Sequence, residues 1–223
     1  MKQEHSVGEM APSGALAMSV ERDLGVLTMR SPARAWRLHN WLRNRWSQDL
    51  KLTVFRFFGR ITGHVWLESR LYLKVLHADG TFTDLGLVGR KVVTTVGVGF
   101  IVDAFQGLVE PEDMKFHGFG TGTTGENVAD TDIETELTTQ YASDNVRPTG
   151  TTTEGASANI YRTVATLSPD SGGTIAVTEH GVLSDAAVGS GVLLDRTVFA
   201  AVNIVASQDS LQATYELTLT AGS

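Results

Sequence analysis

The sequence predicts a mainly β protein. We expect an antiparallel β-sandwich or partial barrel, a short basic N-terminal helix or arm, and one short internal helix. The first observation is a period of two residues in several short segments after residue 50, which is typical of half-buried strands. The second is that turns rich in glycine separate these segments, as in sandwiches and barrels. The third is a helical period in a short arginine-rich stretch near the N-terminus.

The composition supports a folded chain and excludes several kinds of site. Of the 223 residues, 42% are hydrophobic and 19% are charged, which is enough to bury a core in one or two domains. The chain has no cysteine, which excludes disulfides, thiolate zinc sites, iron–sulfur clusters and cysteine nucleophiles. The sequence shows neither a run of about 20 apolar residues nor an apolar signal segment, so we expect a protein made in a cytoplasm.

The charge is divided between two parts of the chain. Residues 30–60 contain eight basic residues and one acid, a net charge of +7. Residues 101–223 contain four basic residues and seventeen acids, a net charge of −13. We therefore divide the chain into an N-terminal arm, residues 1–49, and a β-rich body, residues 50–223. Such an asymmetry could hold two copies of the chain together or bind two separate partners.

A basic, tryptophan-rich helix is predicted within the arm. Ser31 and Pro32 form a helix start, with serine as the N-cap and proline at the first helical position. Leu38, Leu42 and Trp46 then recur at helical spacing. Aromatic residues and arginine dominate protein–protein hot spots. The candidate interface residues are therefore the tryptophans and arginines of this helix: Arg34, Trp36, Arg37, Trp41, Arg43, Arg45 and Trp46.

Docking to a partner or packing within the chain explains this helix better than two alternatives. A nucleic-acid site is disfavoured because the whole chain carries a net charge of −7 and one short helix makes few phosphate contacts. A membrane surface is disfavoured because the helix is short and its tryptophans do not form one face. Whether the helix docks between subunits or packs within one chain stays open at the level of sequence.

The first strands are predicted around a hairpin. Residues 1–31 show no clear period and predict an extended arm, whereas residues 51–58 are rich in aromatic and branched side chains and predict a strand. Residues 70–77 alternate between apolar and polar side chains. Asp79 and Gly80 follow them and predict a tight turn into a return strand.

The second half of the chain combines one helix with short strands. Thr94 or Thr95 caps a helix that is predicted to run through Phe105 and to end at Gly107. Alternation and glycine-rich turns predict further strands at residues 115–120, 158–167, 174–180, 192–205 and 211–220.

A polar stretch, residues 121–157, is too long for an ordinary connection, so we expect a functional excursion or an interaction loop. Its helical candidate is residues 130–137.

Residues 120–125 match G-x-G-x-x-G, but acids follow the motif and no strand–helix alternation surrounds it, which disfavours a nucleotide site. The acids at residues 130–136 lack the glycine and glutamate of a calcium loop. They predict a solvated acidic helix end, with a looser cation site as the weaker alternative.

Catalytic chemistry is not expected. His180, Ser184 and Asp185 are close in sequence, but triads are usually assembled from distant segments, and the sequence has no nucleophile elbow. The six histidines are scattered and form none of the usual zinc spacings. We predict no enzyme activity, no cofactor and no metal site.

Six segments from Gly89 onward form an ordered set. They are Arg90–Phe105, Phe116–Thr131, Tyr161–Thr166, Ile175–Val182, Leu194–Ile204 and Asp209–Thr218. Their order is similar to that of a family of tailed-bacteriophage virion proteins. No single segment is diagnostic, so the ordered set carries the resemblance, and residues 1–88 lie outside it.

The resemblance implies a structural virion protein rather than an enzyme. It favours a capsid decoration (cement) protein that binds and stabilises the shell through its arm and its β body, with a tail, neck or fibre-attachment component as the alternative. The implied location is the virion, on the capsid surface rather than the tail. The implied partners are the major capsid protein and further copies of the chain, as a dimer or trimer, or tail or neck proteins in the alternative. Neither nucleic acid nor a membrane is an expected partner. A sugar-binding module is a weaker hypothesis because most tryptophans precede the β body.

Overall fold

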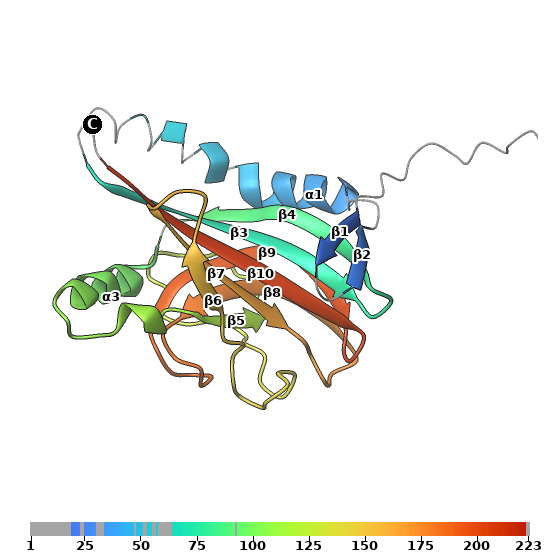
Figure 1. The fold of residues 1–223 in the computed structure, drawn as a ribbon. Helices are drawn as coiled ribbons and strands as arrows, with labels where there is room; N and C mark the ends of the chain where they lie inside the picture. Colours follow the sequence, from blue (N-terminus) through green and yellow to red (C-terminus); the bar gives the residue numbers. More distant parts are fainter. Residues whose placement is uncertain are drawn as a thin grey trace, which may run out of the picture.

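In the computed structural model, two β-sheets lie against each other and a helical segment runs along one side of them (Figure 1). The structure describes residues 19–22, 25–29, 34–46, 48–50, 53, 54, 57, 64–91 and 93–221. The helices bounded within these residues are α1 (Arg34–Asn40), the π-helical η1 (Trp41–Arg45), α3 (Thr95–Phe105) and the 3-10 helix η2 (Pro111–Asp113). The strands are β1 (Ser19–Arg22), β2 (Gly25–Met29), β3 (Trp66–His77), β4 (Thr81–Lys91), β5 (Phe116–Gly120), β6 (Thr151–Glu154), β7 (Ile160–Leu167), β8 (Thr174–Leu183), β9 (Leu193–Val205) and β10 (Asp209–Thr220).

The strands form one large and one small sheet. The large sheet has the order β1-β2-β4-β3-β10-β7-β6, and the small sheet has the order β5-β8-β9. All neighbouring strands are antiparallel except β2 and β4, which are parallel. Apolar side chains from both sheets form the core between them, among them Leu73 and Leu211 from the large sheet and Val177 and Phe199 from the small one. The predicted fold class is therefore confirmed.

The centre of the large sheet follows the period that the sequence predicts. Leu73 and Val75 of β3 lie opposite Ala213 and Leu211 of β10, and all four side chains are buried. Their neighbours along each strand are half-buried on the other face. This alternation places every second side chain in the core, which is the physical basis of the predicted strands.

The tight turn between β3 and β4 is confirmed. Gly80 has φ of +74°, a conformation that glycine adopts without steric cost. The Gly80 N–H donates to the carbonyl of His77 at 3.0 Å, and the Thr81 N–H donates to the Asp79 carboxylate at 2.9 Å. The side chain before the glycine therefore holds the turn that reverses the chain.

Two predictions of local structure are wrong over the described residues, and one strand was missed. Residues 51–58 were expected to form a strand, but residues 53, 54 and 57 are helical and continue the segment that begins with α1. Residues 130–137 form turns and a single bridge to β5 instead of a helix, because their carboxylates pair with arginines from other segments. The strand β6 was not predicted and lies within the polar stretch. Residues 1–18, 23, 24 and 30–33, which include the predicted helix start, lie outside the described residues.

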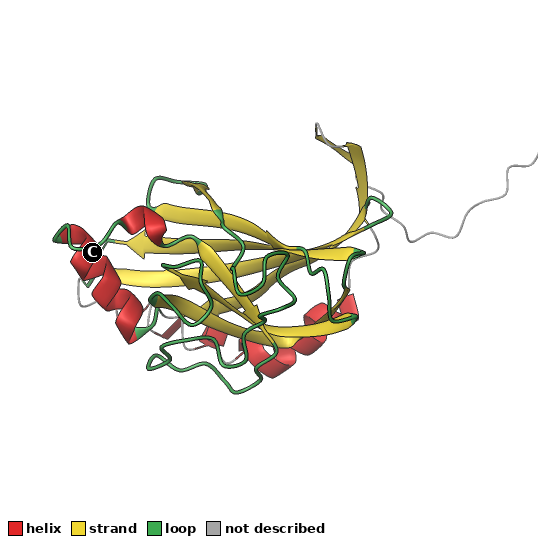
Figure 2. Cartoon of the chain, turned by 90° about the horizontal axis from the view of Figure 1, so that it is seen from below, coloured by secondary structure: helices red, strands yellow, loops and turns green. Residues whose placement is uncertain are grey.

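Residues 121–147 of the polar stretch form a third layer on the small sheet. Strands β8 and β9 are buried at almost every position, so both of their faces are covered. The large sheet covers one face, and residues 121–147 cover the other through contacts with Glu179 and Arg196. Figure 2 views the molecule from below and shows these loops in front of the strands. The stretch is thus part of the folded body.

Candidate functional site

The helical segment at residues 34–46 bridges the two sheets at one side of the sandwich. Among the side chains described in this segment, that of Asn40 alone is buried. The Asn40 side-chain amide donates to the Val88 carbonyl of β4 at 2.9 Å, and its oxygen accepts from the Ala200 N–H of β9 at 3.0 Å. One side chain therefore satisfies backbone groups of both sheets and fixes the helix across the gap between them.

Trp36 is a second anchor on the inner side of the helix. Its indole N–H donates to the carbonyl of Ala201 in β9 at 3.0 Å. The half-buried ring packs against the core that fills the space between the sheets. Trp36 thus packs within the chain.

Two arginines of the helix bind the backbone of β4. The Arg37 guanidinium donates to the carbonyl of Asp84 and lies 3.8 Å from its carboxylate. The Arg45 guanidinium donates to the carbonyl of Leu87 at 2.8 Å and pairs with Asp49 at 3.3 Å. These half-buried arginines fix the orientation of the helix on the sandwich, so their charge serves contacts within the chain.

The other predicted interface residues face outward. Arg34, Trp41, Arg43 and Trp46 are exposed, and the two indoles retain 41% and 51% of their accessible surface. Further exposed apolar side chains extend this surface at spacings of three or four residues. We call the resulting apolar surface the helix outer face; it comprises Leu38, Trp41, Leu42, Trp46, Leu50, Val54 and Phe57.

The local backbone widens where the tryptophans lie. The Trp46 N–H donates to the Trp41 carbonyl five residues earlier, so the turn between them is π-helical. A shallow groove of about 560 Å³ lies along this part of the helix, between Trp41, Leu42, Trp46 and Leu50. Such wide turns occur often at functional sites. The helix outer face therefore offers large apolar side chains on a backbone that its inner side holds in place.

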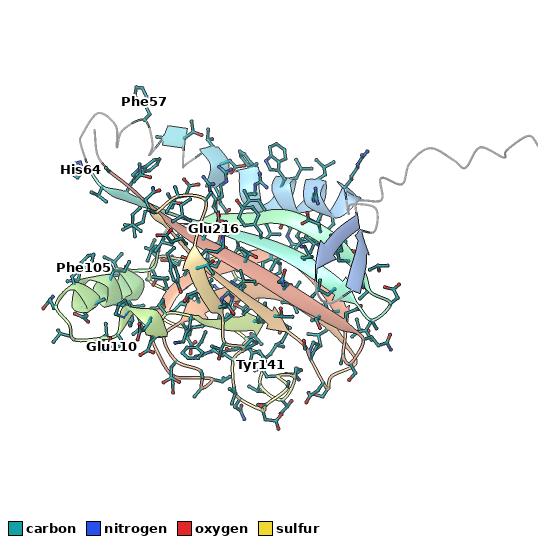
Figure 3. The ribbon with its side chains drawn as sticks, viewed as in Figure 1. Phe57, His64, Phe105, Glu110, Tyr141 and Glu216 are labelled. Atoms are coloured by element: carbon teal, nitrogen blue, oxygen red, sulfur yellow. The ribbon has the colours of Figure 1, made fainter. Side chains whose placement is uncertain are left out.

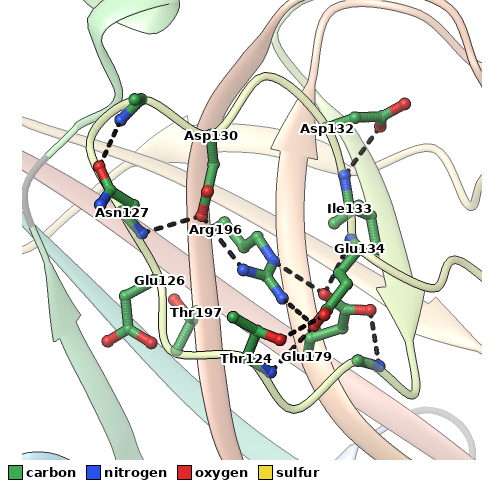
Figure 4. Close-up of polar contacts among 12 residues, drawn as sticks. Thr124, Glu126, Asn127, Asp130, Asp132, Ile133, Glu134, Glu179, Arg196 and Thr197 are labelled. Carbon is green, nitrogen blue, oxygen red and sulfur yellow. Dashed lines mark hydrogen bonds and ion pairs between the residues drawn. The ribbon is translucent and has the colours of Figure 1, made fainter.

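Asp130 and Glu134 of the polar stretch, together with Glu179 of β8, converge on Arg196 of β9 (Figure 4). Its guanidinium binds Glu179 at 2.8 Å, Glu134 at 3.0 Å and Asp130 at 3.1 Å. Glu179 is fully buried, and its carboxylate also accepts from the backbone N–H groups of Gly122, Glu134 and Thr135. This network attaches residues 122–135 to the small sheet.

Arg147 holds the second half of the same stretch. Its side chain is completely buried and binds both carboxylate oxygens of Glu136, at 2.6 and 2.8 Å. It also donates to the carbonyls of Asp185, Ala187 and Ser190 at 2.7–2.9 Å. Burial acts to lower the pKa of Arg147, but the hydrogen bonds and charge of Glu136 raise it above its ordinary value, so the guanidinium stays charged.

Two buried histidines meet between the sheets. His117 Nδ1 lies 2.9 Å from His180 Nε2, and His117 Nε2 lies 3.2 Å from the Thr163 hydroxyl of the large sheet. Burial lowers the pKa of His117 to about 3 and also lowers the pKa of His180, with a further contribution from the charge of His117. Both imidazoles are therefore neutral at physiological pH.

The residues that resemble a catalytic triad and a nucleotide-binding loop in the sequence make structural contacts instead. His180 faces His117 in the interior, whereas Ser184 and Asp185 lie in the turn after β8, where Ser184 accepts from Val192 N–H and Asp185 from Ala187 N–H. Within residues 120–125, the Gly122 N–H already donates to the Glu179 carboxylate. This glycine-rich turn therefore holds a carboxylate of its own chain.

No protein-family model matches the chain, and no curated protein matches it at a significant level. Over the described residues, none of the helices is long and apolar enough to cross a membrane.

Proposed function

We propose that this chain is a structural protein of a tailed-bacteriophage virion, a capsid decoration protein, and that the helix outer face is the surface through which it binds a protein partner. The order of segments from Gly89 onward supports the virion class. The geometry of the helix supports the binding surface. The proposal excludes a catalytic role, a cofactor, nucleic acid and a membrane as parts of the function.

The observation that carries the proposal is the contrast between the two sides of the helix. The inner side is held by Trp36, Arg37, Asn40 and Arg45 through hydrogen bonds to the sheets. The outer side presents two exposed indoles among leucines. Contiguous exposed apolar surface marks interaction sites, and tryptophan and arginine are the residues most enriched at their energetic centres. Since the helix is already ordered, binding costs little conformational entropy.

The decisive experiment is the copy number of the chain in purified virions, measured by quantitative mass spectrometry against the major capsid protein. A decoration protein is expected at a ratio near one or at a simple fraction such as one third. A ratio of a few per cent would overturn the decoration role in favour of a tail, neck or fibre-attachment component. Absence from purified virions would overturn the virion proposal itself.

The binding surface is tested separately with empty capsids. The double variant Trp41→Ala, Trp46→Ala is expected to bind the particle at least tenfold more weakly than the unmodified chain. The matched control is Val146→Ala, which removes an exposed apolar side chain from another part of the body. Equal binding by the double variant and the control would show that the helix outer face is not the docking surface.

A further inference from the structure

The helix α3 carries a second exposed apolar surface on a firmly attached backbone. The Thr94 hydroxyl caps the helix by accepting from the Gly97 N–H at 3.0 Å and donates to the Leu193 carbonyl of β9 at 2.6 Å. Gly97 lies so close to β9 that an added Cβ would come within 2.7 Å of the Leu194 carbonyl oxygen. The first turn of α3 is therefore seated against the small sheet.

The opposite side of α3 is uncovered in the described structure. Val98, Val102 and Phe105 recur at spacings of four and three residues and lie on one side of the helix. Phe105 retains 83% of its accessible surface and points away from the body (Figure 3), and Leu108 follows in the next turn with 68%. We call these four side chains the α3 outer face.

The two apolar faces carry opposite charges. Residues 34–46 contain four arginines and no acid, and Arg34 and Arg43 are exposed beside the helix outer face. Residues 95–113 contain four acids and no basic residue. Three of these acids, Glu110, Glu112 and Asp113, are exposed beyond the end of α3. Apolar centres with charged surroundings of opposite sign are the arrangement that steers two surfaces together.

We propose that the helix outer face of one copy binds the α3 outer face of a second copy. This inference rests on the proposed function, because it names the partner of the same docking surface. The segment of α1 and η1 and the helix α3 lie on different sides of the molecule (Figure 1), so the contact joins unlike surfaces. An open assembly then has one free helix outer face at one end and one free α3 outer face at the other.

A contact between unlike faces repeats from copy to copy until it closes into a ring or extends along a surface. On a shell that holds many copies, each copy would be held to its neighbours through these two faces and to the shell through another part of the body, and the combined affinity would exceed that of either contact. Loss of the contact between copies would therefore also weaken binding to the particle.

The test is a complementation experiment with the full chain in solution. Leu42→Asp places a charge on the helix outer face, and Phe105→Asp places one on the α3 outer face; both side chains are exposed, so neither change disturbs the core. Sedimentation of the unmodified chain is expected to show association that rises with concentration and weakens at high salt. Each variant alone is expected to associate at least tenfold more weakly, while Val146→Asp associates as the unmodified chain does.

An equimolar mixture of Leu42→Asp and Phe105→Asp separates this arrangement from others. Each variant keeps the face that the other has lost, so the mixture is expected to form a one-to-one heterodimer and nothing larger. A chain that is monomeric at all concentrations, or a mixture that forms no heterodimer, would overturn the inference. Association that is weakened by Leu42→Asp but not by Phe105→Asp would also overturn the inference, because it would indicate a symmetric contact between two helix outer faces. The copy number in virions is measured independently, so the proposed function can stand when this inference fails.

Discussion

Two regions of this molecule use arginine side chains for different purposes. Arg147 of the third layer and Arg196 of the small sheet beneath it are buried and surrounded by carboxylates and carbonyls of their own chain. In the helical segment, Arg37 and Arg45 are half-buried and bind the backbone of β4, which leaves the opposite side of the helix exposed. In the first region the charges stabilise contacts within the chain. In the second they fix the inner side of the helix to the sandwich, so that its outer side is available to a partner.

This difference explains why charge alone is a poor guide to interaction sites. The acids of residues 121–157 look like a binding surface in the sequence, yet those that face the small sheet are neutralised from within. The large apolar side chains of the helix outer face carry no charge, yet they are the ones left exposed. If this difference holds, the third layer stabilises the fold, whereas the helix outer face contributes little to stability and serves association.

The largest effect is expected when one partner of a buried ion pair is removed. Arg147→Met removes the charged donor that the Glu136 carboxylate and three backbone carbonyls share, which should lower the free energy of unfolding by about 3–5 kcal/mol. Denaturant unfolding followed by circular dichroism measures the change. The double variant Arg147→Met, Glu136→Gln should recover part of the loss because no buried charge is left unpaired. A loss below about 1 kcal/mol for the single variant would contradict a structural role for the third layer.

The buried histidine pair makes the sandwich sensitive to acid. In the folded state the pKa of His117 lies near 3, below the value of about 6.5 in the unfolded chain, so the unfolded state takes up the proton first. The contribution of His117 to the free energy of unfolding is therefore fully present above about pH 6.5 and is lost as the pH falls toward 3. We expect His117 alone to cost roughly 2 kcal/mol between pH 6.5 and pH 5, and the lowered pKa of His180 acts in the same direction.

The measurement is the slope of the unfolding free energy against pH, which counts the protons that unfolding takes up. His117→Gln should reduce this slope by up to one proton below pH 6.5, whatever its effect on stability at neutral pH. His39→Gln is the matched control, because His39 is exposed on α1. An unchanged slope in His117→Gln would show that this imidazole titrates in the folded protein much as it does in the unfolded chain.

The sequence predicts the sheets better than the third layer because the two depend on different information. The strands β3 and β10 are visible in a two-residue period that is local to each strand. The Asp79-Gly80 turn is likewise determined by two adjacent residues. The pairing of Arg196 with Glu179, Glu134 and Asp130 joins segments up to 66 residues apart, and no local pattern reports it.

The candidate site was predictable only where it depends on local residue type, and not where it depends on how the helix packs on the sheets. Tryptophans and arginines of a basic helix indicate an interface by residue type alone, and Trp41 and Trp46 are indeed exposed. Which residues face inward depends on where the helix meets β4 and β9, so the role of Asn40 could not be foreseen. The strand predicted at residues 51–58 was wrong where residues are described because the intrinsic preference of aromatic and branched side chains for strands is weak and structural context overrides it.

A smaller effect on stability is expected at the contact between the helix and the sheets. Asn40→Ala removes a buried donor and a buried acceptor and leaves the Val88 carbonyl and the Ala200 N–H without this partner, at a cost of about 1–3 kcal/mol. Thermal and denaturant unfolding measure the loss. His39→Ala, one residue earlier and exposed, should cost less than about 0.5 kcal/mol. Equal effects of the two variants would mean that the helix is not fixed through Asn40.

The smallest effect on stability is expected on the helix outer face, and it separates a docking surface from a core. Leu42 and Trp46 retain more than half of their accessible surface, so replacing either by serine should change the free energy of unfolding by less than about 0.5 kcal/mol. Burial of a leucine in a core would instead make its loss cost about 2–5 kcal/mol. Denaturant unfolding of the dilute, monomeric chain distinguishes these values. A small loss of stability together with a large loss of association is the combination that only a surface kept for a partner explains.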